Sequence, residues 1–384
     1  MEITAIADAT RSSLIRSIGR NVEVPSISNP PIEATAVPTR RHCSERFLET
    51  IKPFDRVVLV SHVNPDPDAL ASMMGLECLI RNKLPGKTII LTVDGIIARA
   101  ENQAMVKLLA IPLVPVSHVN IDESTAIVMV DSQPFTGRRA SEAARPHAVL
   151  DHHETPGCVE GVPFQDIRPQ FGATSTIVTG YLLEQNLGVT PRLATALLYG
   201  IDSETTGYPR EACSQDDGAL IWLFPRADKD LLARIKNTRL PQSYFATFHH
   251  ALSNAYIYED VVYSWCGTVP QPDIIAELAD FFIRFEKVTW SVCVGVFDKN
   301  LKISARVSAT GLHSGEMLRH VVEGLGNAGG HDKRAGGQIV LADDSPETIA
   351  ATVQDVRERL LAELEVDESS GQRLLDARPA VPQP

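Results

Sequence analysis

The sequence predicts an α/β protein in which a doubly wound parallel sheet is followed by a smaller α/β domain. From Arg56 onward, short β-branched runs that are apolar throughout alternate with helix-length segments, as in a parallel sheet covered on both faces. From about Tyr256 the order of strand-like and helix-like segments changes, which indicates a second sheet. With 384 residues, 44% hydrophobic content and a mean hydropathy of −0.03, the chain is long enough for two ordinary globular cores.

The first domain is expected to alternate strands and helices. Apolar β-branched runs that end in polar residues predict strands at 56–62, 87–95, 125–132 and 147–153. Helical patterns predict helices at 69–84, 102–110, 172–186 and 191–200, followed by a connecting stretch rich in charge and helix formers at 214–240. We expect Asp68 to cap the helix that starts at Ala69, because its carboxylate can accept a bond from a free backbone N–H.

The second domain is expected to hold its own sheet and helices. Strand-like runs lie at 261–269, 289–298, 301–308 and 337–343, and helix-like segments lie at 272–286 and 314–326. A glycine-rich turn precedes the last strand. Gly324, Gly326, Gly329 and Gly330 would all suit positive φ positions after a helix end.

Domain boundaries follow from composition. Prolines spread among Ser, Asn and Thr predict a flexible leader over 1–42, and the stretch 366–384 predicts a flexible tail. Between them we expect a catalytic domain at 43–236, a linker at 237–255 near Pro241, and a second domain at 256–365.

Charge and cysteine usage exclude several classes of protein. A formal charge of −12 and a sequence pI of 5.4 argue against a coat for long nucleic acids or a binder of anionic membranes. The 6 cysteines form no C-x-x-C pair, so neither a disulfide framework nor a thiolate zinc site is indicated. No secretory signal or membrane-length apolar run is evident, and a reducing cytoplasm is the expected location.

Acidic and histidine side chains gather where the predicted strands of the first domain end. The clusters are His62, Asp66 and Asp68 after the first strand, Asp131 after a later one, Asp151, His152 and His153 after the last, and Asp202 and Glu204 after the helix that ends at Gly200. Found singly, each has a common explanation as a cap, a turn residue or a surface pair. As an ordered set they are expected to converge, because the carboxyl ends of the strands share one edge of a doubly wound sheet.

So many carboxylates at one edge need cations to offset their repulsion. Oxygen ligands mixed with imidazole suit Mn²⁺, with Mg²⁺, Co²⁺ or Fe²⁺ as alternatives, and the residues suffice for two ions. Two metals about 3.5 to 4 Å apart would bind a phosphoryl oxygen, supply the nucleophile and offset charge as the leaving oxygen departs.

The glycine-rich stretch of the second domain has two readings. Taken alone, it is a helix C-terminal turn. With Arg306, Lys333 and Arg334 nearby, it becomes a phosphate cradle in which backbone N–H groups and fixed cations meet an anion.

These motifs together resemble those of the DHH phosphoesterases. The matching stretches are His62-Val-Asn-Pro-Asp66-Pro-Asp68-Ala, Asp131-Ser, Asp151-His152-His153, and Gly200-Ile-Asp-Ser-Glu204-Thr. In the second domain, the stretch from Gly329 to Gly336 is similar to the GGHxxAAG signature of the DHHA1 domain, and Ser304-Ala-Arg306 resembles its S-x-R strand. Within the family, the architecture is most similar to the short bacterial enzymes that degrade oligoribonucleotides and dephosphorylate adenosine 3′,5′-bisphosphate.

The resemblance implies roles for individual residues. One metal would be held by His62, Asp66 and Asp131, and the other by Asp68, Asp131, His152 and Glu204, with Asp131 as the bridge. Asp151 would orient its histidine neighbour, and His153 would face the scissile phosphate as a donor or acid. Arg306, Gly329, Gly330, His331 and Arg334 would bind the substrate.

Two positions depart from the family pattern. Glu204 stands where the fourth motif usually carries aspartate, so Asp202, two residues earlier, is a rival metal ligand. Arg334 replaces a small residue of the glycine-rich signature, and it could either add a phosphate contact or narrow the pocket.

The resulting hypothesis is a Mn²⁺-dependent hydrolase for short RNA, linear dinucleotides or a 3′-phosphorylated nucleotide, with homodimers possible. Inorganic pyrophosphatase or polyphosphatase activity is an alternative, since those relatives share the first-domain motifs. A nucleotide sensor with a degenerate metal site is another alternative, supported by Glu204 alone.

Overall fold

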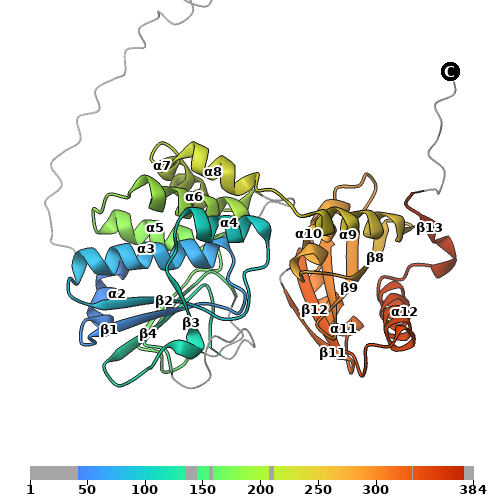
Figure 1. The fold of residues 1–384 in the computed structure, drawn as a ribbon, viewed down its shortest axis with the longest axis horizontal. Helices are drawn as coiled ribbons and strands as arrows, with labels where there is room; N and C mark the ends of the chain where they lie inside the picture. Colours follow the sequence, from blue (N-terminus) through green and yellow to red (C-terminus); the bar gives the residue numbers. More distant parts are fainter. Residues whose placement is uncertain (1–41, 135–144, 155–158, 207–211, 331, 376–384) are drawn as a thin grey trace, which may run out of the picture. The chain divides into compact units, whose positions relative to one another are not determined.

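The computed structural model of the protein describes residues 42–134, 145–154, 159–206, 212–330 and 332–375. The expected leader at 1–42 lies outside these residues, apart from His42. Two sheets account for the strands of the described chain (Figure 1). The predicted fold class, a parallel α/β sheet followed by a second α/β unit, is confirmed.

The first sheet has 6 parallel strands in the order β3-β2-β1-β4-β5-β6. Its strands are β1 (Arg56–Val60), β2 (Thr88–Val93), β3 (Leu113–Pro115), β4 (Thr125–Val130), β5 (Ala148–Asp151) and β6 (Phe164–Ile167). After β1 the chain builds outward through β2 and β3, then returns to place β4 on the other side of β1. The carboxyl ends of β1 and β4 therefore lie side by side at the point where the strand order reverses, which is where such sheets form a crevice.

Helices cover one face of this sheet, and Figure 1 shows α3 and α5 lying along it. The helices of this part of the chain are α2 (Cys43–Ile51), α3 (Pro67–Lys83), α4 (Ala100–Leu108), α5 (Thr174–Glu184), α6 (Pro191–Thr205), α7 (Ser214–Leu223) and α8 (Lys229–Lys236). The larger core packs β-strand side chains such as Val57 and Leu59 against α2, α3, α5 and α6. The alternate residues Val58 and Val60 belong to a smaller cluster on the opposite face. Burial on both faces explains why these strands are apolar throughout.

The second sheet has 7 strands in the order β11-β12-β10-β9-β8-β7-β13 and is antiparallel except between β8 and β9. Its strands are β7 (Ala255–Tyr258), β8 (Val261–Thr268), β9 (Trp290–Phe297), β10 (Asn300–Val307), β11 (Gly326–Gly330), β12 (Arg334–Val340) and β13 (Gln372–Arg373). Its helices are α9 (Gln242–Ser253), α10 (Asp273–Phe282), α11 (Ser314–Val321) and α12 (Pro346–Glu363). One core joins the sheet to α11 and α12, and another joins it to α9 and α10.

The structure corrects the expected glycine-rich turn. Gly324, with φ of 75°, ends the helical region as expected, but Gly326–Gly330 form the edge strand β11, paired antiparallel with β12. A Cβ on Gly326 would lie 2.1 Å from the Gln338 carbonyl oxygen, so glycine is required here for close strand approach and not for a turn. Of the last two glycines, only Gly330 has a positive φ, of 151°.

The end of the described chain also differs from the expectation. Gln372–Arg373, predicted to lie in the tail, pair with β7 as β13, after a 3-10 turn at Glu368–Ser370. The tail is therefore not wholly without structure. Among the residues described, no helix combines the length and the apolar character needed to cross a membrane.

The close packing of α3 on α5 gives a stability prediction. A Cβ on Gly75 would lie 2.4 Å from Cγ1 of Val178, a branched side chain that cannot easily turn aside, so Gly75→Ala should lower the free energy of unfolding by about 1–3 kcal/mol. Gly180→Ala on α5 is the matched control, because its Cβ meets nothing within 4 Å and should raise stability by about 0.5–1 kcal/mol. Urea unfolding followed by circular dichroism measures both; equal midpoints for the two variants would contradict the packing.

Candidate metal centre

The loop after β1 places His62 and Asp66 at the edge of the first sheet. Oδ1 of Asp66 accepts a hydrogen bond from Ala69 N at 2.9 Å, so Asp66 caps α3. The prediction that Asp68 caps a helix starting at Ala69 is wrong, because α3 begins at Pro67, whose ring fixes a helical φ and whose nitrogen needs no acceptor. Asp68 lies inside the first turn and is fully buried.

Asn64 fixes this loop, although the sequence analysis did not single it out. Its backbone has a φ of 61°, its N–H donates to Asp94 O at 2.9 Å, and its Oδ1 accepts from Ile96 N at 2.7 Å. A Cβ on Gly95 would lie 2.2 Å from Asn64 Oδ1, so glycine is needed at that position. The sequence offered only a weak signal, because Asn tolerates the left-handed conformation better than most residues with a Cβ. The loop carrying His62 is thus tied to the loop after β2.

Asp131 lies at the end of β4 in a constrained conformation. Its φ of 55° falls in the left-handed region, which Asp and Asn adopt more readily than other residues with a Cβ. Its N–H donates to Leu150 O at 2.8 Å, which ties the turn to β5. The side chain is 1% exposed, and its Oδ1 accepts a hydrogen bond from Thr174 Oγ1 at 3.0 Å. Asp131 is therefore held on both its backbone and its carboxylate.

His62 and His152 present the same ring nitrogen to Asp131 from opposite sides. His62 Nδ1 lies 3.0 Å from Val63 O, and His152 Nδ1 lies 3.2 Å from Phe171 O. Because a carbonyl oxygen can only accept, each Nδ1 carries the hydrogen. Nε2 of His62 then lies 3.5 Å from Asp131 Oδ2, and Nε2 of His152 lies 3.5 Å from Asp131 Oδ1. Backbone contacts of this kind orient histidines that bind metal through Nε2.

Asp151 holds both histidines that follow β5. Its Oδ1 accepts hydrogen bonds from His152 N at 2.8 Å and from His153 Nδ1 at 2.8 Å. Burial opposes the charge of Asp151, but the bond with His153 outweighs this and lowers the pKa of the carboxyl. His153 Nδ1 also lies 3.8 Å from Asp131 Oδ1, so the ring is oriented beside the central carboxylate.

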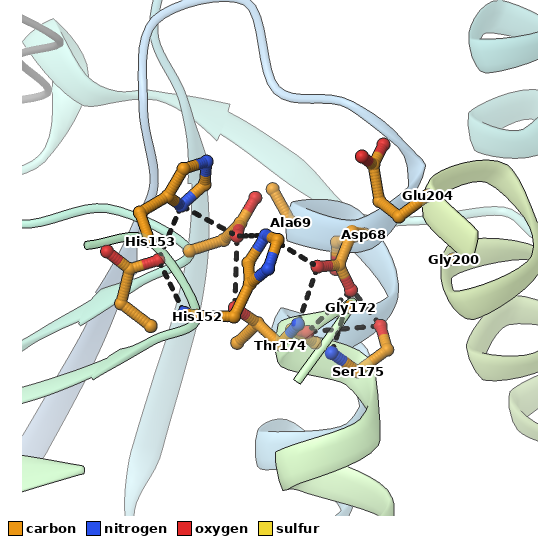
Figure 2. A network of polar contacts seen from close by, with 12 residues as sticks. Asp68, Ala69, His152, His153, Gly172, Thr174, Ser175, Gly200 and Glu204 are labelled. Carbon is orange, nitrogen blue, oxygen red and sulfur yellow. Dashed lines mark hydrogen bonds and ion pairs between the residues drawn. The ribbon is translucent and has the colours of Figure 1, made fainter. Parts of the chain in front are cut away.

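The N-terminus of α5 binds the carboxylate of Asp68, as Figure 2 shows. Thr174 N donates to Asp68 Oδ2 and Ser175 N donates to Asp68 Oδ1, both at 2.7 Å. Asp68 Oδ2 lies 4.0 Å from His152 Nε2. The sequence analysis did not predict these partners. The start of the helix, Ala173-Thr-Ser-Thr, is rich in hydroxyl side chains, and the first backbone N–H groups of a helix have no acceptor within the helix.

The fourth motif lies within a helix, and not after one as the sequence predicted. α6 continues through Gly200 to Thr205. A Cβ on Gly200 would lie 2.7 Å from Ser175 Oγ and 3.0 Å from Ala71 Cβ. Glycine is therefore needed at this position for close approach of α6 to α3 and α5, and it does not mark a helix end.

The two acids of the fourth motif have different surroundings. Asp202 forms an ion pair with Lys236 of α8. Glu204 instead lies close enough to the centre to sense its charges, and burial together with Asp66 raises the pKa of its carboxyl. In Figure 2 no polar contact joins Glu204 to the other residues drawn.

Two groups of ligand atoms share Asp131. One contains His62, Asp66 and Asp131, and the other contains Asp131, His152 and His153; within each group the ligand atoms lie within 4.8 Å of one another. The first group is the ligand set expected for one metal. Of the set expected for the other, Asp68, Asp131 and His152 come together, while the structure records no direct contact between Glu204 and these three residues; Glu204 Oε2 instead lies 3.8 Å from Arg334 Nη1. Carboxylate oxygens with imidazole Nε2 atoms form a donor set that suits Mn²⁺ and related divalent ions.

The charges of the centre explain why cations fit it. Burial opposes the protonated form of His152, but Asp131 and Asp68 outweigh it and raise the pKa of the imidazole to about 9. Asp131 and Asp66 likewise raise the pKa of His62 well above its usual range, against the effect of burial. Burial and the nearby charge of Asp131 raise the pKa of Asp68. Without metal, protons thus take the place that positive ions would fill.

Arg306, predicted to bind substrate, lies on β10 and is 7% exposed. Its Nε and Nη2 donate to the carboxylate of Asp280 on α10, and its Nη1 donates to Ser304 Oγ at 2.8 Å and to Ala305 O at 2.9 Å. The guanidinium is thus fixed in orientation, and Asp280 was not anticipated as its partner.

Arg334 lies directly opposite Arg306 across β10 and β12. Gly329 and Gly330 belong to the neighbouring strand β11, and a Cβ on Gly330 would lie 2.3 Å from Arg334 O. Nε of Arg334 is buried and has no hydrogen-bond acceptor among the residues that the structure describes. His331 lies outside those residues.

Family comparisons agree with the two sheets. The N-terminal domain of the DHH family matches residues 56–201, and the DHHA1 domain matches residues 258–360. The first range contains the two groups of ligand atoms around Asp131 but ends before Glu204, and the second contains the Arg306–Arg334 pair.

Individual relatives are more distant. The uncharacterised protein MJ1633 of Methanocaldococcus jannaschii is 30% identical over 286 residues, which cover 74% of this chain and 58% of that protein. NrnA of Streptococcus mutans, described as a probable bifunctional oligoribonuclease and PAP phosphatase, is 26% identical over 161 residues, which cover 41% of this chain and 48% of that protein. The chain therefore spans about half the length of these curated relatives.

Among solved structures, an exopolyphosphatase-related protein of Bacteroides fragilis matches with a TM-score of 0.66 and 18% identity, covering 84% of this chain and 97% of that one. At this identity the match shows a shared fold. Taken with the two domain matches and the motifs that hold the metal centre, these findings show that the chain belongs to the DHH family and carries a DHHA1 domain after its DHH domain.

Proposed function

We propose that the protein is a phosphoesterase that works with two divalent ions, Mn²⁺ being the preferred one. The observation that supports this most is the position of Asp131, whose two carboxylate oxygens face His62 on one side and His152 on the other. A single buried carboxylate between two oriented imidazoles is suited to bridge a pair of cations.

Different residues of this chain would bind the two ions. His62, Asp66 and Asp131 would hold one ion, and Asp68, Asp131, His152 and Glu204 the other. When bound, such ions supply Lewis-acid chemistry that offsets charge on a phosphoryl oxygen and activates the attacking water.

His153 would act as the proton donor to the phosphate or to the leaving oxygen. Its ring is fixed by Asp151, which binds Nδ1 and so determines the direction in which the opposite edge of the ring points. Asp151 would therefore orient His153 without touching the substrate.

For the substrate we propose short oligoribonucleotides, linear dinucleotides or adenosine 3′,5′-bisphosphate. The name of the Streptococcus mutans relative supports this class. The Arg306–Arg334 pair and the glycines of β11 would bind a terminal phosphate, because guanidinium groups and closely approaching backbone suit anions. The net charge of −12 disfavours a long nucleic-acid track. A cytoplasmic location and a homodimer stay predictions.

The proposal predicts Mn²⁺-dependent release of mononucleotides from a dinucleotide and of phosphate from adenosine 3′,5′-bisphosphate. Asp131→Asn should reduce both rates by at least about 100-fold, because the bridging charge is lost. Its melting temperature should change little, because Asn tolerates a φ of 55°. Chromatography of products and a coupled phosphate assay measure the rates.

The same substrate panel separates the alternatives. Turnover of pyrophosphate or polyphosphate without turnover of nucleotides would favour a phosphoanhydride hydrolase. Intact nucleotide binding without any turnover would favour a sensor. Wild-type rates in Asp131→Asn would contradict the metal assignment.

The surroundings of the fourth-motif acids predict different effects of their substitution. Glu204→Gln should lower bound metal and activity together, by about 10–100-fold in metal affinity, because we propose Glu204 as the ligand. Asp202→Asn should leave metal content unchanged and cost about 0–1 kcal/mol of stability, because Asp202 is paired with Lys236 near the surface. Metal analysis after dialysis, alongside rate, measures both. Loss of metal in Asp202→Asn alone would reverse the assignment.

Metal binding should release protons. In the metal-free protein Asp131 and Asp68 raise the pKa of His152 to about 9 against the effect of burial, so near pH 7 the ring is protonated and must lose that proton to bind a cation. Metal affinity should therefore rise with pH up to the raised pKa, by about tenfold per pH unit for each proton displaced. Mn²⁺ calorimetry in buffers of different ionisation enthalpy counts the protons. Heats that do not depend on the buffer would contradict this prediction.

A further inference from the structure

Thr174, the first residue of α5, is not a proposed metal ligand, but its side chain contacts Asp131, which is one. Its Oγ1 donates to Asp131 Oδ1 at 3.0 Å, and both side chains are buried. This hydroxyl is neutral and acts here as a hydrogen-bond donor. What it can do is determine how the carboxylate of Asp131 is turned.

The Thr174 hydroxyl binds only one of the two carboxylate oxygens of Asp131. Oδ1 of Asp131 faces His152 at 3.5 Å and His153 at 3.8 Å, whereas Oδ2 faces His62 at 3.5 Å. Thr174 therefore binds the carboxylate oxygen on the His152 side and leaves the His62 side untouched. The oxygen has two lone pairs, so it can accept this hydrogen bond and still bind a cation.

The same helix terminus also fixes Asp68, the other acid on that side. Thr174 N and Ser175 N each donate to one oxygen of Asp68 at 2.7 Å (Figure 2). No comparable support from α5 reaches Asp66, whose Oδ1 is bound by Ala69 N of its own helix. The start of α5 thus orients two carboxylates of one metal position and none that belongs only to the other.

We propose that Thr174 is a positioning residue for one ion of the pair, the ion held by Asp68, Asp131 and His152. This inference rests on the proposed function. Its hydroxyl keeps Asp131 Oδ1 directed at that position, in a turn where Asp131 already has an unusual φ of 55°. Without the hydroxyl, the carboxylate can rotate toward His62 and serve a single ion.

Thr174→Val removes the hydroxyl and keeps the branched shape of the side chain. We expect the affinity for one Mn²⁺ to fall by about 10–100-fold while the other is retained, because loss of a hydrogen bond to a ligand typically has this effect. Isothermal titration with Mn²⁺ counts the ions and separates their affinities. Anomalous scattering from crystals soaked in Mn²⁺ then shows which position is empty, and we expect the His62 position to stay filled.

Two further variants make the result specific. Thr174→Ser keeps the hydroxyl and should restore the second ion. Thr179→Val removes another buried hydroxyl of α5, one that binds Ser175 O of its own helix at 2.7 Å, and should keep both ions. Thermal melting of the metal-free variants shows whether Thr174→Val is folded; if it is not, the Mn²⁺ stoichiometry of Thr174→Ala decides in its place.

The outcomes are distinct. Two ions bound with wild-type affinity in Thr174→Val, or an empty His62 position with the other filled, would overturn this inference and leave the two-metal phosphoesterase standing. A wild-type protein that binds fewer than two ions would overturn the proposed function, and the inference with it. Loss of one ion in Thr174→Val and its return in Thr174→Ser would support the inference.

Discussion

The metal centre depends on one electrostatic constraint, the repulsion among carboxylates that the strand order brings to a single edge. β1 and β4 are neighbours in the sheet although a long stretch of chain separates them, so the loops that follow them meet. Asp66 and Asp68 lie at the start of α3, directly after the loop that follows β1, and Asp131 follows β4. Burial makes their mutual repulsion costly, and only protonated histidines or bound cations can offset it. The raised pKa of His62 is the direct sign of this constraint, because Asp131 and Asp66 outweigh the effect of burial.

Rigid support follows from the same constraint. A buried carboxylate that is free to turn would relax away from its neighbours, and the site would lose its shape before an ion arrived. Each acid is instead held. Backbone N–H groups bind the carboxylates of Asp66 and Asp68, and the Thr174 hydroxyl binds that of Asp131, whose own N–H donates to Leu150 O. These bonds offset part of the cost of burial and preorganise the oxygens. Glycines at positions 75 and 200 belong to this support, because they let α5 and α6 come close enough to reach the site.

Much of this was predictable from the sequence, and what was missed has a common physical origin. The apolar runs predicted the strands of the first sheet, and the polar residues at the ends of those runs predicted the clusters that converge. Both predictions rest on patterns between residues that are near in sequence. The cap of α3 was misplaced by two residues, since Asp66 and Asp68 both suit a cap and only the position of Pro67 decides between them. The end of α6 was misjudged because Gly200 serves packing against other helices. Thr174, Asn64 and Asp280 were missed because each acts on a residue distant in sequence, and no periodic pattern reports such a contact.

In the second sheet the repulsion is between positive charges. Arg306 and Arg334 lie directly opposite each other on β10 and β12, an arrangement in which like charges destabilise a sheet. Asp280 offsets the charge of Arg306 through its contacts with that guanidinium, and Glu204 Oε2 lies 3.8 Å from Nη1 of Arg334. Nε of Arg334 nevertheless remains buried without an acceptor among the residues described. An anion bound beside them would relieve both the repulsion and the unsatisfied donor. A cationic pair confined to two strands, within a chain of net charge −12, would suit one phosphate group better than a long polyanion, as the proposed function requires.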